Sequence, residues 1–423
     1  MKELILKNAL VIDPARNIQS VGDIGISEGH IAEPASLKNP EVIDLTGKVL
    51  SPGFIDLHVH LRQPGNTAAE TIASGTAAAA AGGFTSIVAM PNTSPAADTA
   101  GAIEYLRQTA AAHGIVRVLP CGNMTKGGKG EEMAGIGGLK SAGIVALSDD
   151  GKCIQDHALM HHVVEYAKSF DLPILDHCEE VTLAAGGVMH EGKWSVLLGM
   201  NGISSASEEL MVARNVILAR MADWKIHMQH ISAKESVEHL RKARAAGIRV
   251  SGEATPHHIT LTDECIKKFD TNYKMNPPLR SEADRLAVIE GLADGTLTAI
   301  ATDHAPHTVT AKLVEFDHAP FGIIGLETAL ALSYTELVTK GVLTLPQLIA
   351  KFTSGPADIL GMKDYTLACG NTADITVIDP ECVWTIDKNK FKSKARNTPF
   401  DGMKVTGRPV MTIVGGNIVY RGE

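Results

Sequence analysis

The sequence predicts an α/β protein in which a (β/α)8 barrel carries a small β-sandwich domain formed by both ends of the chain. Short strand patterns without helices occupy both ends, and a strand, loop and helix pattern repeats between them. Eight such repeats over about 300 residues favour a TIM barrel. A doubly wound open sheet is disfavoured, because no G-x-G-x-x-G motif follows an early strand.

Both ends of the chain have the alternating apolar pattern of half-buried strands. Residues 4–6 and 9–12 show it near the start, and residues 374–380 and 409–414 show it near the other end. Neither end has enough strands to bury a sheet face alone, so we expect the two to pair. The predicted domains are therefore residues 1–51 and 365–423, which together form the small β domain, and residues 52–364, which form the barrel.

The segment between the two ends alternates short apolar runs with amphipathic stretches. The apolar runs predict strands at residues 54–60, 86–90, 116–121, 144–147, 173–177, 226–230, 248–253 and 298–303. The amphipathic stretches predict helices at residues 70–81, 102–112, 157–169, 208–221, 234–246 and 282–292. In a barrel of this type, catalytic groups lie at the carboxyl ends of the strands.

The first barrel strand ends in two histidines, His58 and His60. Residues two apart on a strand point to the same face, so the two imidazoles should converge. Neutral imidazole is a common zinc ligand, and this pair supplies half of a four-coordinate site. An isolated His-x-His also occurs by chance at the end of a core strand, so the interpretation depends on the other strand ends.

Four further strand ends carry residues of the same chemistry. These are Ser148-Asp149-Asp150-Gly151, Asp176-His177, Gln229-His230 and Thr302-Asp303-His304. Packing alone does not explain so many ligand types at one end of a barrel. Four histidines and two carboxylates provide more ligands than one ion needs. The pattern therefore predicts two metal ions about 3.5 to 4 Å apart with a bridging carboxylate. We expect His227, three residues before His230, to point to the opposite face.

Composition excludes several classes of partner. The net charge is −9, the pI is near 6.0 and no run of Lys and Arg is dense enough to neutralise several phosphates, so no nucleic acid is expected. There is no membrane-length apolar run and no signal-peptide pattern, so we expect a cytoplasmic protein that does not contact the membrane. The six cysteines are scattered without a C-x-x-C motif, which predicts reduced thiols.

The motifs together resemble a known family. Residues 52–62, PGFIDLHVHLR, are similar to the opening signature of the amidohydrolase superfamily. The other motifs resemble those of the class I bacterial dihydroorotases over nearly the whole chain: Met90-Pro91-Asn92-Thr93, Ser148-Asp149-Asp150-Gly151, His177-Cys178-Glu179, His230-Ile231-Ser232, Thr255-Pro256-His257-His258, Lys274-Met275-Asn276-Pro277-Pro278-Leu279-Arg280, Ala301-Thr302-Asp303-His304-Ala305-Pro306-His307 and Ala319-Pro320-Phe321-Gly322.

The resemblance implies a role for each matching position. One zinc ion would be held by His58, His60 and Asp303, the second by His177 and His230, with Asp150 bridging the two Zn²⁺ of each subunit. Related enzymes bridge their metals with a carboxylated lysine, for which Lys152 is the nearest candidate; because Lys152 lies beyond Gly151, the aspartate bridge is preferred. The implied substrate-binding residues are His60, Arg62, Asn92, Asn276, His307, Phe321 and Gly322.

The implied activity is the reversible, zinc-dependent hydrolysis of (S)-dihydroorotate to N-carbamoyl-L-aspartate, the third step of de novo pyrimidine biosynthesis. Hydroxide activated by the metals would attack the ring amide carbonyl, with Asp303 as general base and acid. Arg62 can grip the substrate carboxylate in bidentate fashion. Residues 308–318, which contain few core residues, could form a lid.

Two alternatives to this activity remain at this stage. The enzyme could act on another cyclic amide, as a hydantoinase or allantoinase does, although Arg62, Asn92 and His307 argue against this. The chain could be an inactive scaffold for aspartate transcarbamoylase, but such scaffolds typically lack the metal ligands. By resemblance alone we expect a homodimer, with association with aspartate transcarbamoylase as a further possibility. One departure from the family pattern is Gln63, which stands where many relatives carry an acidic residue.

Overall fold

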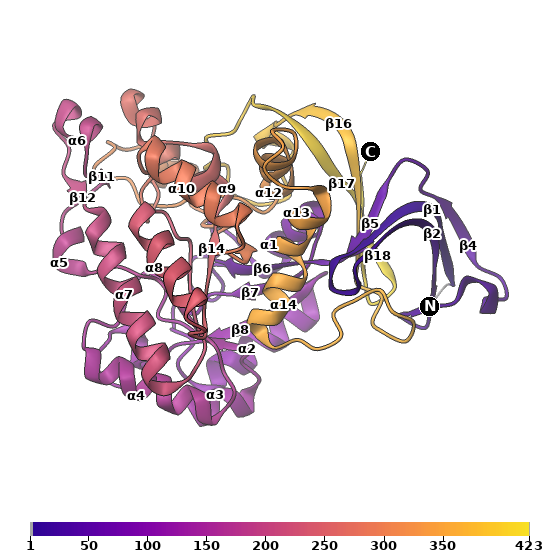
Figure 1. Cartoon of the computed structure of the whole chain (residues 1–423), viewed down its shortest axis with the longest axis horizontal. Coiled ribbons are helices and arrows are strands. Elements are labelled where there is room, and N and C mark those ends of the chain that lie inside the picture. Colours follow the sequence, from indigo (N-terminus) through magenta and orange to yellow (C-terminus); the bar gives the residue numbers. More distant parts are fainter. Residues whose placement is uncertain (1–2, 423) are drawn as a thin grey trace.

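The computed structural model describes residues 3–422 and contains a barrel of eight parallel strands (Figure 1). The strands follow one another in chain order, and a parallel bridge between Val59 and His304 joins the first strand to the segment after the last. Every strand expected between the two ends is present, so the predicted barrel is confirmed. Its strands are β6 (Phe54–Val59), β7 (Phe84–Ala89), β8 (Arg117–Gly122), β9 (Ala146–Leu147), β10 (Ile174–Asp176), β13 (Ile226–Met228), β14 (Val250–Ala254) and β15 (Ala299–Ile300).

Helices surround these strands, and all six predicted ones are found within a few residues of the expected bounds. They are α1 (Ile72–Ala81), α2 (Ala100–His113), α4 (His157–Ser169), α7 (Ser205–Ala222), α8 (Lys234–Ala245) and α10 (Glu282–Ala293). The others are α3 (Ile136–Ala142), α5 (Val181–Ala184), α6 (Lys193–Leu198), α9 (Pro256–Thr260), α11 (Val309–Lys312), α12 (Ala329–Ser333), α13 (Leu345–Phe352) and α14 (Ser354–Leu360). Among residues 3–422, none of the helices has the length and hydropathy that crossing a membrane requires.

Local sequence explains where several of these helices begin. Thr71 and Ser74 form a reciprocal capping box at the start of α1, and Ser281 and Asp284 form another at α10. Asp156 accepts two backbone N–H groups at the start of α4. These caps satisfy amide donors that would otherwise lack a partner at each helix start.

The two ends of the chain pair in one mixed, eight-stranded sheet, as expected (right of Figure 1). Strand β5 runs parallel to β1 and antiparallel to β16, so the N-terminal and C-terminal segments meet along it. The members are β1 (Leu4–Asp13), β2 (Ile18–Ser27), β3 (His30–Ala32), β4 (Glu41–Asp44), β5 (Val49–Pro52), β16 (Ile375–Thr385), β17 (Lys404–Val414) and β18 (Asn417–Arg421). A separate short parallel pair comprises β11 (Met189–His190) and β12 (Gly202–Ile203).

A single residue, Gly53, connects the terminal sheet to the first barrel strand. A Cβ atom at this position would lie only 2.0 Å from Thr85 Oγ1, so no larger residue fits without movement of β7. The short connection fixes where β6 begins, and it therefore also fixes the position of the histidines at the other end of this strand.

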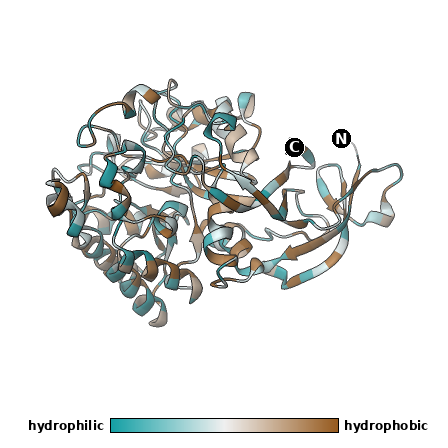
Figure 2. Cartoon of the chain, turned by 90° about the horizontal axis from the view of Figure 1, so that it is seen from above, coloured by the Kyte–Doolittle hydropathy of each residue, from teal (hydrophilic) through white to brown (hydrophobic). Residues whose placement is uncertain are grey.

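The apolar core has two parts around the barrel wall. Phe54, Phe84 and Phe352 pack together between the strands and the helices, with ring centroids 5.1 to 5.9 Å apart. Inside the barrel, a separate buried cluster includes Leu57 and Leu175. The strands are accordingly brown, hydrophobic segments within the molecule in Figure 2. Because the interior is filled by side chains, it leaves no open channel, and ligands can bind only at the ends of the barrel.

Candidate active site and metal centre

The predicted metal ligands lie together at the carboxyl end of the barrel. His58 is in β6, and the other ligands follow the ends of their strands. All are buried, with exposed fractions of 7 % or less: His58, His60, Asp150, His177, His230 and Asp303. His230 and Asp303 have positive φ angles of 35° and 46°, uncommon for residues with a side chain. The chain therefore turns sharply after β13 and β15, at His230 and Asp303.

Three overlapping groups of these side chains have ligand atoms within 4.8 Å of one another: His58, His60 and Asp150; His58, His230 and Asp303; and Asp150, His177 and His230. Asp303 Oδ1 lies 3.3 Å from His58 Nε2 and 3.1 Å from His60 Nε2. Asp150 Oδ1 lies 3.2 Å from His58 Nε2, 3.8 Å from His177 Nδ1 and 3.9 Å from His230 Nε2. Asp150 thus stands between the two histidine pairs.

The structure distinguishes the two neighbouring aspartates. Asp149 Oδ1 accepts hydrogen bonds from the backbone N–H groups of Met124 and Thr125 and from the Asn123 side chain, and Thr125 Oγ1 donates to Asp149 Oδ2. Asp149 therefore holds a loop, whereas Asp150 faces the histidines. Lys152, the alternative bridging residue, has an exposed side chain.

Unpartnered ring nitrogens support a metal centre at this position. His58 Nδ1 and Nε2, His177 Nε2 and His230 Nδ1 are buried without a hydrogen-bond partner among the described residues. A buried polar atom without a partner costs free energy, and a metal ion is the partner that imidazole nitrogen and carboxylate oxygen share. The donor set, two carboxylates and four imidazoles, therefore fits one or more divalent ions.

The charges of the site reinforce this arrangement. Burial on its own would raise the pKa of the Asp150 and Asp303 carboxyls, but His58 beside both holds the pKa of each below its usual value. Both carboxylates therefore stay ionised at neutral pH, the state in which they bind metal.

Asn92 orients two of the ligands at once. Its Oδ1 accepts a hydrogen bond from His60 Nδ1 at 3.0 Å, and its Nδ2 donates to Asp150 Oδ2 at 3.1 Å. Because Nδ1 of His60 carries the proton in this arrangement, Nε2 keeps its lone pair toward Asp303 and Asp150. A hydrogen bond behind a ligand fixes its tautomer and ring plane.

Glu253 of β14 supports the opposite side of the site and was not identified from the sequence. Its Oε1 lies 3.7 Å from His58 Nδ1, and its Oε2 lies 3.0 Å from His227 Nε2. His227 lines the cavity at the other end of the barrel, and Glu253 connects it to the site. A carboxylate near the end of a buried β-strand was the available signal, since an unpaired charge is rarely buried there.

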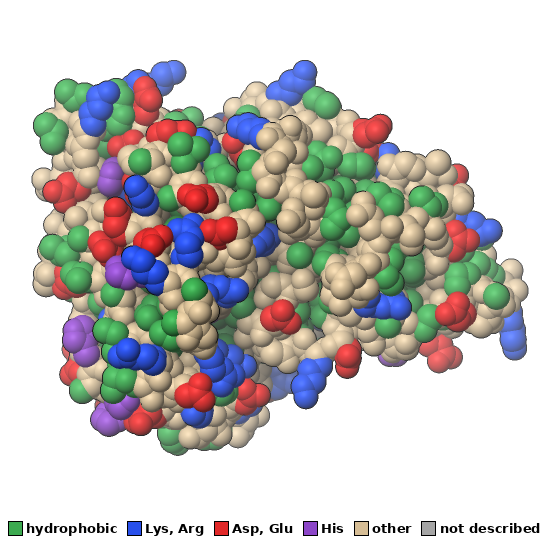
Figure 3. Space-filling view, in the orientation of Figure 1, with side chains coloured by type: hydrophobic (Ala, Val, Ile, Leu, Met, Phe, Trp, Pro, Cys, Tyr) green, Lys and Arg blue, Asp and Glu red, His purple; other side chains and the backbone are tan. Residues whose placement is uncertain are grey.

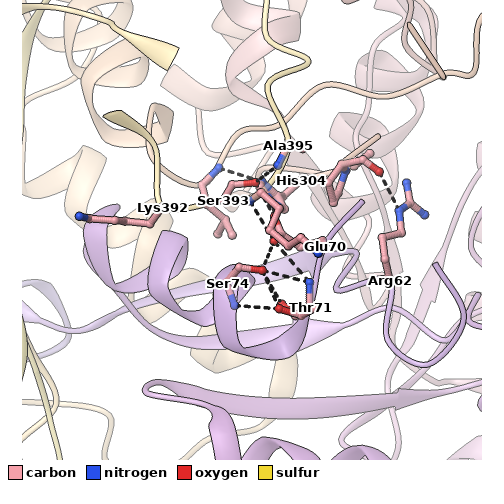
Figure 4. Close-up of polar contacts among 12 residues, drawn as sticks. Arg62, Glu70, Thr71, Ser74, His304, Lys392, Ser393 and Ala395 are labelled. Atoms are coloured by element: carbon pink, nitrogen blue, oxygen red, sulfur yellow. Dashed lines mark hydrogen bonds and ion pairs between the residues drawn. The ribbon is translucent and has the colours of Figure 1, made fainter. Parts of the chain in front are cut away.

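Two further carboxylates, those of Glu179 and Glu70, hold residues of the site in place, a role that was not identified from the sequence. Glu179 Oε2 accepts a hydrogen bond from Asn276 Nδ2 at 2.8 Å and lies 3.9 Å from His177 Nε2. Glu70 is completely buried and joins His304, at 3.3 Å, to the hydroxyl of Ser393 (Figure 4). It therefore ties the segment after β15 to the loop before β17.

All seven predicted substrate-binding residues line one cavity of about 290 Å³ beside the candidate metal centre. They are His60, Arg62, Asn92, Asn276, His307, Phe321 and Gly322. Arg62, with a φ of 57°, is held by a hydrogen bond from its Nε to the carbonyl oxygen of Pro306 at 3.1 Å, as Figure 4 shows. His307 Nε2 donates to the carbonyl oxygen of Phe321 at 2.7 Å.

This fold and site define a class of protein. A (β/α)8 barrel with two histidine pairs and two aspartates at the carboxyl ends of its strands is an amidohydrolase, a cyclic amide hydrolase barrel. A family model described as dihydro-orotase-like matches residues 47–236. The chain is 49 % identical to a dihydroorotase of Pelotomaculum thermopropionicum over 99 % of both chains, and 49 % identical to one of Solibacter usitatus over 99 % of this chain and 98 % of that one. It belongs to the dihydroorotase family.

Solved structures with the same fold include hydantoinases. The L-hydantoinase (dihydropyrimidinase) from Arthrobacter aurescens is 26 % identical with a TM-score of 0.89, over 100 % of this chain and 97 % of that one. The dihydropyrimidinase from Brevibacillus agri, 24 % identical with a TM-score of 0.87 over 99 % and 95 %, shares the fold.

Proposed function

We propose that the chain catalyses the reversible hydrolysis of (S)-dihydroorotate to N-carbamoyl-L-aspartate, the third step of de novo pyrimidine biosynthesis. The observation that carries this proposal is the cavity in which an arginine and two asparagines lie beside a carboxylate and histidine cluster. Full-length similarity to relatives named dihydroorotase supports the same substrate. The cavity offers a cation to the one substrate group, a carboxylate, that simple cyclic amides lack.

Two Zn²⁺ ions per subunit fit the ligand types, since imidazole and carboxylate are usual zinc donors. His58, His60 and Asp303 would hold one ion, His177 and His230 the other, and Asp150 both; the exposed position of Lys152 favours the aspartate bridge. When bound, such ions supply water activation at neutral pH and polarisation of the scissile carbonyl.

The residues of the chain supply binding and proton transfer. The Arg62 guanidinium grips the substrate carboxylate, assisted by Asn92 and His307, while Asn276 and the backbone of Phe321 and Gly322 contact the polar edge of the ring. Asp303 is the catalytic residue. Its carboxylate, ionised at neutral pH, accepts a proton from the attacking water and returns it to the departing ring nitrogen.

We propose that the barrel, residues 52–364, carries this chemistry, and that residues 1–51 and 365–423 form a separate β domain that positions it. The six cysteines are unpaired, which supports action in the reducing cytoplasm. A homodimer and association with aspartate transcarbamoylase are proposed on family resemblance alone. Light scattering after size exclusion, with and without aspartate transcarbamoylase, tests both.

The experiment that tests the function combines metal analysis with substrate specificity. Purified protein is assayed for zinc per chain and for hydrolysis of L-dihydroorotate, followed by the loss of its ultraviolet absorbance, with hydantoin and allantoin as controls. We expect about two zinc ions per chain and turnover of dihydroorotate alone. Turnover of hydantoin or allantoin instead would replace the proposed substrate, and absence of both metal and activity in zinc-replete medium would favour a scaffold.

A further inference from the structure

A second cavity near the barrel lies at the opposite end from the candidate active site. It has a volume of about 730 Å³ and is lined by residues that precede strands: Pro173 before β10, Lys225 before β13, Arg249 before β14 and Thr298 before β15. The candidate active site lies after the same strands. Because the interior of the barrel is filled, the two cavities are separate. We call this one the basal cavity.

The basal cavity has an excess of positive charge. Four cationic side chains line it, those of Lys225, Arg244, Arg249 and Lys351, against two carboxylates, those of Asp294 and Asp358. Lys225 is paired with Asp171 at 3.3 Å, and Asp294 is paired with Arg241 at 2.7 Å, so these two charges are already balanced.

The remaining three cations have no ion-pair partner among residues 3–422. Arg244 donates to the carbonyl oxygen of Val250 at 3.3 Å, and Lys351 donates to that of Leu297 at 2.6 Å. Arg249 lies over the Trp224 ring, 5.0 Å from its centroid. In Figure 3, blue Lys and Arg side chains lie on this face, over α8 and toward α14, interspersed with red Asp and Glu side chains.

Burial of Lys351 makes the excess of positive charge in the basal cavity energetically unfavourable. Its side chain is 9 % exposed, and burial, followed by the nearby Arg244, lowers its pKa to about 8. Asp294 opposes this lowering only in part. A buried cation whose charge is incompletely balanced opposes folding, and an anion in the cavity would reduce that cost. Arginine guanidinium groups match the geometry of phosphate oxygens, and a phosphate monoester carries a charge of about −1.5 to −2 at pH 7.

The size and lining of the cavity indicate more than inorganic phosphate. Apolar side chains of Pro173, Leu292, Leu343 and Ile359 form part of its wall. Ligand cavities of several hundred Å³ typically combine such apolar walls with a few charged groups. We propose that the basal cavity binds a phosphate ester of a small organic molecule, with Arg244, Arg249 and Lys351 at the phosphate and the apolar wall at the organic group.

Calorimetric titration of the full-length, zinc-loaded protein with phenyl phosphate, at constant ionic strength, tests this site. We expect saturable binding at one site per chain, at least about tenfold tighter than inorganic phosphate. The double variant Arg244→Gln/Arg249→Gln should raise the Kd about tenfold or more, because charged hydrogen bonds contribute about 1.5 to 3 kcal/mol each. Both arginines are exposed, so the variant should fold.

The matched control is Lys242→Gln/Arg220→Gln, which removes the same charge from exposed positions outside the cavity. It should bind phenyl phosphate as the unmodified protein does. Arg62→Gln should also retain binding, because Arg62 lines the other cavity. Absence of saturable binding, an unchanged Kd in the Arg244/Arg249 variant, or an equal loss in either control would overturn the proposal. Equal affinities for inorganic phosphate and phenyl phosphate would show that the cavity does not recognise the organic group of the ester.

Discussion

Glu253 lies directly behind His58, with its Oε1 3.7 Å from His58 Nδ1 and its Oε2 3.0 Å from His227 Nε2. All three side chains are almost fully buried. Although burial opposes ionisation, the contacts with His227 and His58 lower the pKa of Glu253 to about 2, so the carboxylate is charged. A charged carboxylate behind an imidazole orients the ring and increases the basicity of its other nitrogen.

Replacing Glu253 with glutamine should therefore weaken zinc binding about 10 to 100-fold. Activity should fall by a similar factor in buffer whose zinc concentration is too low to saturate the site. Zinc titration against a competing chelator, together with circular dichroism, separates this effect from unfolding. Glu209→Gln, which disturbs a half-buried pair with His239 at 3.1 Å, is the matched control and should leave zinc affinity unchanged. Wild-type affinity in Glu253→Gln would refute the positioning role.

Substitutions of the neighbouring residues Asp149 and Asp150 should have different effects. Asp150→Asn should lose metal and activity while its melting temperature in chelator stays close to that of the unmodified protein. Asp149→Asn should instead lower the free energy of unfolding by about 2 kcal/mol, because its carboxylate holds four hydrogen-bond donors. Metal analysis and chemical denaturation of both variants measure this. Full metal content in Asp150→Asn would contradict the assigned bridge.

Removal of the Arg62 guanidinium should affect substrate binding most strongly. Arg62→Gln should reduce kcat/KM for dihydroorotate about 10 to 100-fold, mainly by raising KM, because a charged hydrogen bond contributes about 1.5 to 3 kcal/mol. Zinc content should be unchanged. Arg107→Gln, at an exposed arginine on α2, is the control. An unchanged KM would exclude Arg62 as the carboxylate-binding group.

Asp303→Asn should abolish turnover because it removes both a ligand carboxylate and the proposed proton carrier. Steady-state assays in excess zinc, with zinc content measured in parallel, show which of the two functions is lost. A variant that retains a rate near that of the unmodified protein would contradict the assignment of Asp303 as the catalytic residue.

Lys312, in the 308–318 segment, should impose a pH dependence on stability. Its buried ammonium donates to the carbonyl oxygens of Pro320 and Thr271 at 2.7 and 3.0 Å, and burial, with Lys274 nearby, lowers its pKa to about 7. Between about pH 7 and 10.5 the unfolded chain binds a proton that the folded chain lacks, so stability rises with pH across this window.

Denaturation at pH 7, 8 and 9 tests this dependence. Relative to Lys312→Met, the free energy of unfolding of the unmodified protein should rise by up to about 1.4 kcal/mol per pH unit. Lys340→Met, at an exposed lysine, should keep the slope of the unmodified protein. Identical slopes in the Lys312 variant would show that this lysine is not the cause.

The sequence by itself determined the barrel, the pairing of the two ends and the residues at the carboxyl ends of the strands. Strand and helix periodicity is a local property, and parallel strands align their carboxyl ends whatever the loops do. For this reason His58, His177, His230 and Asp303 could be brought together from the sequence.

Only the tertiary structure decided what stands behind those ligands. Nothing local distinguishes Glu253 or Glu70 from other carboxylates; each acquires its role from a partner more than twenty residues away. Asp149 and Asp150 are adjacent, and their separate tasks follow from which one meets the loop amides of Met124 and Thr125. The basal cavity likewise exists only because helices distant in the chain bring unpaired cations to one end of the barrel.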